Sequence, residues 1–79
     1  MNKDFLPLQT EILKDFLIET GYTIYHLGEF DTYYKYEGVE IKIPNEPTLS
    51  EFVLTNILIE AGITVKRFEN YIQNLKNIA

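Results

Sequence analysis

The chain has 79 residues, of which 46% are hydrophobic and 14% aromatic, so it can form one small core and is not an intrinsically disordered protein. Twelve acidic residues against seven basic ones give a net charge of −5, which disfavours nucleic acid as a partner because phosphate binding needs clustered Lys and Arg. The absence of cysteine excludes a disulfide framework, a thiolate zinc site and a cysteine nucleophile.

The first predicted element is a helix from Pro7 to Thr20. Proline is tolerated in a first helical turn, where its missing N–H group costs nothing. Gly21 comes directly after Thr20 and is expected to end the helix. Five apolar residues recur at helical spacing and predict the buried side of this helix: Leu8, Ile12, Leu13, Phe16 and Leu17.

Three antiparallel strands are predicted next, and the dipeptide Glu37-Gly38 is a tight hairpin signal between the second and third. The third strand alternates apolar and charged residues, so one sheet face should be buried and the other wet. Strict alternation in the first strand places His26 on the same face as Ile24, and Tyr25 on the opposite face with Leu27. The strands are expected at Tyr22–Leu27, Asp31–Tyr36 and Val39–Ile43.

A second helix is predicted from Thr48 to Gly62. Thr48 and Glu51 have the spacing of a capping box, and Pro47 is placed to form a hydrophobic staple with Phe52. Gly62 is expected to end the helix in a left-handed conformation.

Thr64 is predicted to cap a short last helix with its own apolar stripe. A three-stranded sheet cannot hide its apolar face alone, so both principal helices are expected to lie on that face. The sequence therefore predicts one α+β domain over residues 1–79, with its core at about 7–75. Its architecture is a two-layer sandwich in the order helix, three-stranded antiparallel sheet, helix, short helix.

Several residues resemble the HicA (YcfA-like) family, small bacterial toxins with a double-stranded-RNA-binding-like fold that cleave messenger RNA. The matching features are a Gly-aromatic pair after the first helix, a Pro step after the third strand, a Leu-x-x-Ile-Leu-x-x-Ala-Gly-hydrophobic run, and a hydroxyl-hydrophobic-x-x-Phe pattern. They lie at Gly21-Tyr22, Ile43-Pro44, Leu54–Ile63 and Thr64–Phe68. The resemblance extends over about Ile12 to Tyr71 and implies the fold more than the activity.

The resemblance places Asp31 where the family has its catalytic histidine, three residues before Tyr34. A ribonuclease of this type needs a group that exchanges protons near neutral pH, which imidazole does. A carboxylate at this position is charged and repels the phosphate, and Glu29 adds to that repulsion. The resemblance therefore implies a family member whose ribonuclease activity is absent or changed.

His26 is the single histidine of the chain and a weak catalytic candidate, because no acid–base partner lies near it in the sequence. A structural or surface role is the favoured interpretation. The carboxylates of Glu29 and Asp31 are close in sequence, but their spacing is not that of a metal site. We expect no metal and no cofactor.

Five tyrosines fall in the first two strands, and Tyr33 and Tyr34 must point to opposite faces because they are adjacent. Some of these rings must therefore lie on the open face of the sheet. The structural interpretation is cross-strand aromatic pairing. The functional one is a contact surface for a protein, made of Tyr25, Tyr33, Lys35 and Lys42, because the surrounding acidic residues disfavour RNA.

Three functions remain open. The favoured one is a non-catalytic protein of toxin–antitoxin ancestry that binds a protein, either an antitoxin-like partner or a second copy of itself. The alternatives are an active ribonuclease toxin with a rearranged site, and an acidic inhibitor or adaptor encoded by a mobile element. The chain shows no signal-peptide pattern and no apolar run of about 18 residues, so we expect it in the cytoplasm without membrane contact.

Overall fold

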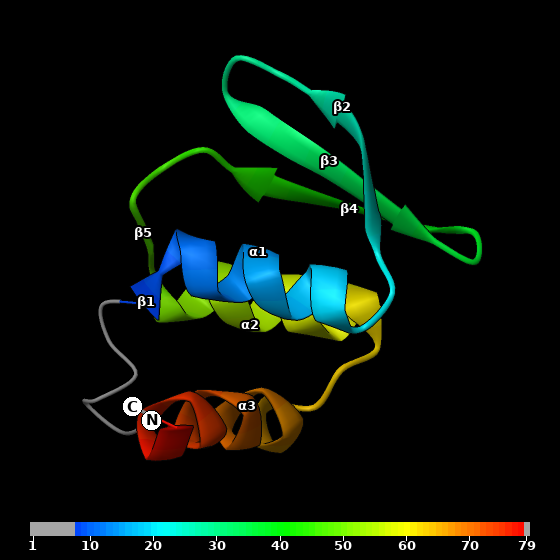
Figure 1. Ribbon diagram of the computed structural model, residues 1–79. Helices are drawn as coiled ribbons and strands as arrows, with labels where there is room; N and C mark the ends of the chain where they lie inside the picture. Colours follow the sequence, from blue (N-terminus) through cyan, green and yellow to red (C-terminus); the bar gives the residue numbers. More distant parts are fainter. Residues whose placement is uncertain (1–7, 79) are drawn as a thin grey trace.

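The computed structural model describes the backbone of residues 8–78. The predicted helix start at Pro7 lies outside these residues, but Leu8 and Gln9, which were also predicted to be helical, form a short strand. The first helix therefore begins at Thr10 and not in the segment before it. Within residues 8–78 the chain forms three helices and five strands (Figure 1). In chain order they are β1 (Leu8–Gln9), α1 (Thr10–Glu19), β2 (Thr23–Leu27), β3 (Asp31–Tyr36), β4 (Val39–Pro44), β5 (Thr48–Leu49), α2 (Glu51–Ala61) and α3 (Val65–Ile78).

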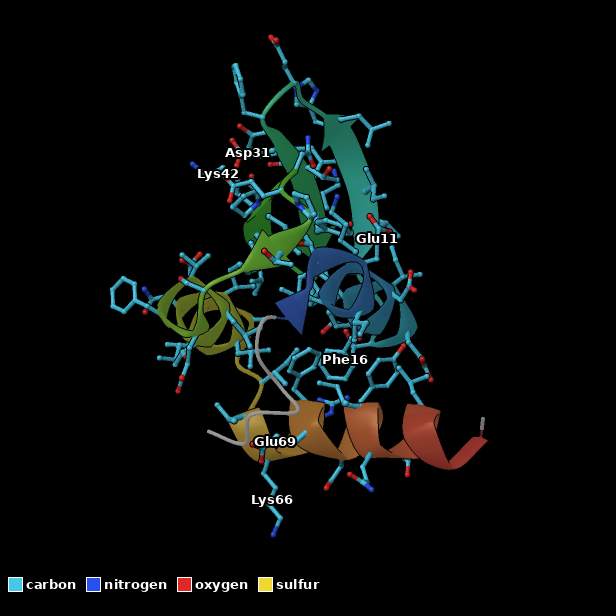
Figure 2. All side chains as sticks on the ribbon, turned by 90° about the vertical axis from the view of Figure 1, so that its left-hand side faces the viewer. Glu11, Phe16, Asp31, Lys42, Lys66 and Glu69 are labelled. Carbon is cyan, nitrogen blue, oxygen red and sulfur yellow. The ribbon has the colours of Figure 1, made fainter. Side chains whose placement is uncertain are left out.

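The predicted α+β arrangement is confirmed. Strands β2, β3 and β4 form an antiparallel sheet in that order, and α1 and α2 lie side by side against one face of it (Figures 1 and 2). The last helix differs from the expectation, since it has 14 residues and is not short. It packs on the side of the helix pair that faces away from the sheet, where the Phe16 ring lies 5.0 Å from that of Phe68 and 4.8 Å from that of Tyr71.

The core lies between the sheet and the helices, and it follows the predicted alternation of β4. Ile41 and Ile43 are buried opposite Tyr34 and Thr32 of β3, whereas Val39 at the start of the strand is 37% exposed. The α2 helix lies below β4. The fully buried hydrophobic side chains are Leu13, Leu17, Tyr34, Ile41, Ile43, Leu54, Leu58 and Phe68.

The predicted alternation of β2 was wrong. Ile24 pairs with Tyr34, but His26 pairs with Tyr33, so a β-bulge at Tyr25 shifts the register by one residue. A one-residue shift moves every later side chain to the other face of a strand. His26 therefore joins Tyr25 on the outer face, which is the sheet face turned away from the helices, and Leu27 moves to the inner side.

The predicted start of α2 was also wrong. Ser50, and not Thr48, is the N-cap, because its hydroxyl oxygen accepts a 3.2 Å hydrogen bond from the N–H of Val53. Thr48 belongs to β5, where it pairs with Gln9 of β1. Phe52 is 75% exposed, so it does not form the staple expected with Pro47.

Two other predicted helix boundaries, the end of α2 at Gly62 and the cap of α3 at Thr64, are confirmed. Gly62 has φ 71° and ψ 26°, a left-handed conformation that a Cβ would strain, and its N–H group donates to the carbonyl oxygen of Ile59. The N–H of Arg67 donates to the hydroxyl oxygen of Thr64 at 3.1 Å, as expected for the cap of α3. Among the residues described, no helix has the length and apolar character needed to cross a bilayer.

Candidate functional site

The outer face of the sheet holds all four residues of the predicted binding surface. Tyr33 and Lys35 alternate with buried residues of β3, and the register places Lys42 opposite Tyr33 and Glu40 opposite Lys35. The bulge of β2 adds Tyr25 and His26. We define the outer face by Thr23, Tyr25, His26, Asp31, Tyr33, Lys35, Glu40 and Lys42.

Tyr25 extends across the whole width of the sheet. Its hydroxyl donates a 2.6 Å hydrogen bond to Oε1 of Glu40 on the far strand, and Lys35 Nζ lies 5.2 Å from the centre of its ring. The hydrogen bond to Glu40 raises the pKa of Tyr25, because ionisation would remove the donor and set two negative charges together. The ring of Tyr25 is thus held in one position on the open surface.

Tyr33 is the centre of an aromatic cluster. Its ring centroid lies 6.0 Å from that of Tyr25 and 5.2 Å from that of His26, and both ring pairs are tilted. Such tilted pairs are a favourable arrangement for aromatic rings. The structural interpretation of the tyrosines therefore holds for these two rings, and the same packing fixes them as a surface.

The turn between β2 and β3 closes tightly at Gly28. Its N–H donates a 2.8 Å hydrogen bond to the carbonyl oxygen of Asp31. A Cβ on Gly28 would lie 2.7 Å from that oxygen and 3.3 Å from the Tyr33 ring, so this turn requires glycine. The turn places Asp31 half-buried at the start of β3, opposite Pro44.

Asn45, which follows β4, holds this turn from the other side. Its amide Nδ2 donates to the carbonyl oxygens of Gly28 at 3.0 Å and Glu29 at 3.4 Å. Its backbone N–H donates to the carbonyl oxygen of Phe30 at 2.8 Å. Its Oδ1 accepts from Thr32 Oγ1 at 2.6 Å. Two large apolar side chains are exposed at this end of the sheet, Leu27 at the end of β2 and Phe30 in the turn, each of them 74% exposed.

Sequence reasoning missed Asn45, Leu27 and Phe30. The proline after the third predicted strand indicates only that the strand ends there, whereas the hydrogen bonds of Asn45 reach residues 13 to 17 positions away. Asp31 and Lys42 lie on the same side of the sheet (Figure 2), and the bulge brings His26 onto that face as well.

The charges of the outer face are balanced, with Lys35 and Lys42 against Asp31 and Glu40. Balanced charges around fixed aromatic rings are more typical of a surface that contacts a protein than of one that contacts a polyanion. Within the described part of the chain, no three His, Asp or Glu side chains form a group that could hold a metal ion.

Comparisons with protein-family models, with curated proteins and with solved structures found no match.

Proposed function

We propose that this chain is a HicA-like protein of toxin–antitoxin ancestry that does not catalyse RNA cleavage and acts by binding an antitoxin-like protein in the cytoplasm. The outer face is the binding surface. The observation that carries this proposal is the pair of tyrosines, Tyr25 and Tyr33, fixed on an open sheet face between lysines and carboxylates.

Fixed aromatic rings favour this role on energetic grounds. Tyrosines are enriched among the residues that dominate protein interfaces. Binding costs less when side chains are already ordered, and Tyr25 is ordered by Glu40 and by the Tyr33 ring. Asp31 supports the non-catalytic half of the proposal, because it lacks the proton-exchanging imidazole that the resemblance assigns to its position.

The test measures affinity for the product of the neighbouring gene, chosen if that gene has an HicB-like pattern. Titration calorimetry would compare the wild type with Tyr33→Ala and Tyr25→Ala. We expect each substitution to weaken binding by about tenfold or more, as truncation of an anchoring aromatic does. Phe52→Ala is the matched control, because Phe52 is also an aromatic residue, is 75% exposed and is located on α2, away from the outer face. Equal affinities for all four proteins would rule out the outer face.

A second candidate is a ribonuclease with a rearranged site, and the β-bulge is the observation that favours it. The bulge places His26 on the outer face at 5.2 Å from the Tyr33 ring, where Lys35 and Lys42 could attract a phosphate. Incubation with single-stranded and duplex RNA tests this function. Cleavage that disappears in His26→Ala or Asp31→Ala would replace the binding proposal with the ribonuclease.

A further inference from the structure

The inner side of strand β2 is not covered by the helices. The bulge leaves Ile24 and Leu27 on the side where α1 lies, and they are 46% and 74% exposed. Ile41 and Ile43, on the same face of β4, are fully buried. One apolar part of the inner face therefore stays open, and exposed apolar surface of this kind marks sites of interaction.

A groove of about 250 Å³ lies between this part of β2 and the helix α1. Its apolar wall is formed by Ile24, Leu27 and the exposed Ile18 of α1. Cavities for drug-sized ligands begin at about 300 Å³, so this groove has room for one or two side chains of a partner. We call it the α1–β2 groove, and its lining includes Glu11, Asp15, Ile18, Ile24, Leu27 and Tyr34.

Two carboxylates of α1 form the other side of the groove. Glu11 and Asp15 are four residues apart, so they lie on the same face of the helix, and both are exposed. Figure 2 shows Glu11 projecting from α1 on the side of β2. Among residues 8–78 neither carboxylate forms an ion pair, and Lys14, which also lines the groove, donates to Oδ1 of Asn45 at 3.2 Å. Like charges at this spacing repel each other, so a cation in the groove would relieve the repulsion.

Tyr34 adds a buried polar group without a partner. Its side chain is 1% exposed, and what remains accessible of it lines the groove. No described residue hydrogen-bonds with its hydroxyl, whose pKa is raised by burial and by the nearby charges of Glu11 and Asp15. Buried polar groups are normally hydrogen-bonded, so this hydroxyl is available to a ligand that enters the groove.

We propose that the α1–β2 groove binds an arginine side chain that a partner protein presents between apolar side chains. The guanidinium contacts the carboxylates of Glu11 and Asp15 and donates to the hydroxyl oxygen of Tyr34. Arginine fits this set better than lysine does, because its five N–H groups serve several acceptors at once and it is more weakly hydrated. Its methylene groups and its apolar neighbours cover the apolar wall of the groove.

The occupant is a different protein and not a second copy of this chain. Arg67 is the only arginine in the sequence, and its guanidinium lies 6.0 Å from the centre of the Phe16 ring, a contact that a second copy would have to give up. The net charge of −5 also opposes self-association and attracts a cationic partner. The groove is separate from the proposed function, because Tyr25 and Tyr33 lie on the outer face.

Nuclear magnetic resonance titration of the full chain with two short peptides tests the proposal. The probe is acetyl-Ser-Leu-Arg-Leu-Ser-amide, and its control has glutamine in place of arginine. The methyl signals of Ile18, Ile24 and Leu27 should shift with a dissociation constant of about 1 mM or lower. The methyl signals of Ile59, exposed on α2, should stay in place. The glutamine peptide should bind at least about tenfold more weakly, and added salt should weaken the binding of the arginine peptide.

Removal of the two carboxylates identifies the contact. Glu11→Gln and Asp15→Asn in one chain should weaken binding of the arginine peptide by about tenfold or more. The matched control is Glu51→Gln with Glu60→Gln, which removes two exposed carboxylates from α2 and should bind like the wild type. Tyr33→Ala should also bind like the wild type, which distinguishes this groove from the outer face.

Four results would each overturn the proposal. They are equal binding of the two peptides, undiminished binding by the variant that lacks both Glu11 and Asp15 carboxylates, and no methyl shift at about 10 mM arginine peptide. The fourth is a shift of the groove methyl signals with protein concentration in the absence of peptide, which would assign the groove to a second copy of this chain.

Discussion

The hydroxyl of Tyr25 donates a 2.6 Å hydrogen bond to Oε1 of Glu40, which links the two edge strands of the sheet across the strand between them. This bond raises the pKa of Tyr25. In Glu40→Gln the pKa of Tyr25 should fall towards its ordinary value of 10.0, because the phenolate no longer faces a carboxylate. Titration of the tyrosinate absorbance measures the change, with Tyr25→Phe identifying the signal. Glu37→Gln in the β3–β4 hairpin is the control and should leave the titration as it is.

Two hydroxyl residues precede α2, and only one of them caps it. Ser50→Ala should lower the free energy of unfolding by about 1 kcal/mol, because the N–H of Val53 loses its acceptor. Thr48→Ala should lower the free energy of unfolding by clearly less, because Thr48 does not cap α2 and pairs within β5 through its backbone. Urea unfolding of the two variants compares the costs. A larger loss for Thr48→Ala than for Ser50→Ala would contradict the assignment of the cap.

This pair of residues also shows where sequence reasoning reaches its limit. The helix itself was predictable, because its apolar positions and Gly62 are local signals. The cap was not, because Thr48 is taken into a pairing with Gln9, which is 39 positions earlier in the chain. Local spacing fitted a capping box, but a long-range strand pair decided which hydroxyl was available.

The outer face was also only partly predictable, because local alternation places some of its residues and long-range strand pairing decides the others. Lys35, Lys42 and Tyr33 follow the simple alternation of β3 and β4, and the structure places them together. His26 could not be placed, because a bulge depends on how two strands are paired and leaves no mark in one strand's own sequence. Whether this surface binds a protein stays a prediction.

Alkaline pH should destabilise the fold through Tyr34. Burial, with the nearby charges of Glu11 and Asp15, raises the pKa of Tyr34 from 10.0 to about 12. The folded state therefore holds this proton more tightly than the unfolded state. Its contribution to stability is complete below pH 10 and is lost as the pH rises towards 12, by up to roughly 1.4 kcal/mol per pH unit.

Chemical denaturation at several alkaline pH values measures this slope. Tyr34→Phe removes the titrating hydroxyl and should make the fall in stability shallower. Tyr36→Phe, at a position that is 41% exposed, is the control and should keep the wild-type slope. A slope in Tyr34→Phe as steep as that of the wild type would show that another group is responsible.

Asn45→Ala should loosen the turn that displays Phe30. The substitution removes two donated hydrogen bonds and leaves the hydroxyl of Thr32, a residue only 4% exposed, without its acceptor. We expect a loss of about 2 kcal/mol in the free energy of unfolding, because a buried polar group without a partner costs its desolvation. Hydrogen exchange of the Gly28 amide should also become faster. Asn56→Ala, on the exposed side of α2, is the matched control and should stay within about 0.5 kcal/mol of the wild type. Equal stability of the two variants would mean that the turn holds its shape without Asn45.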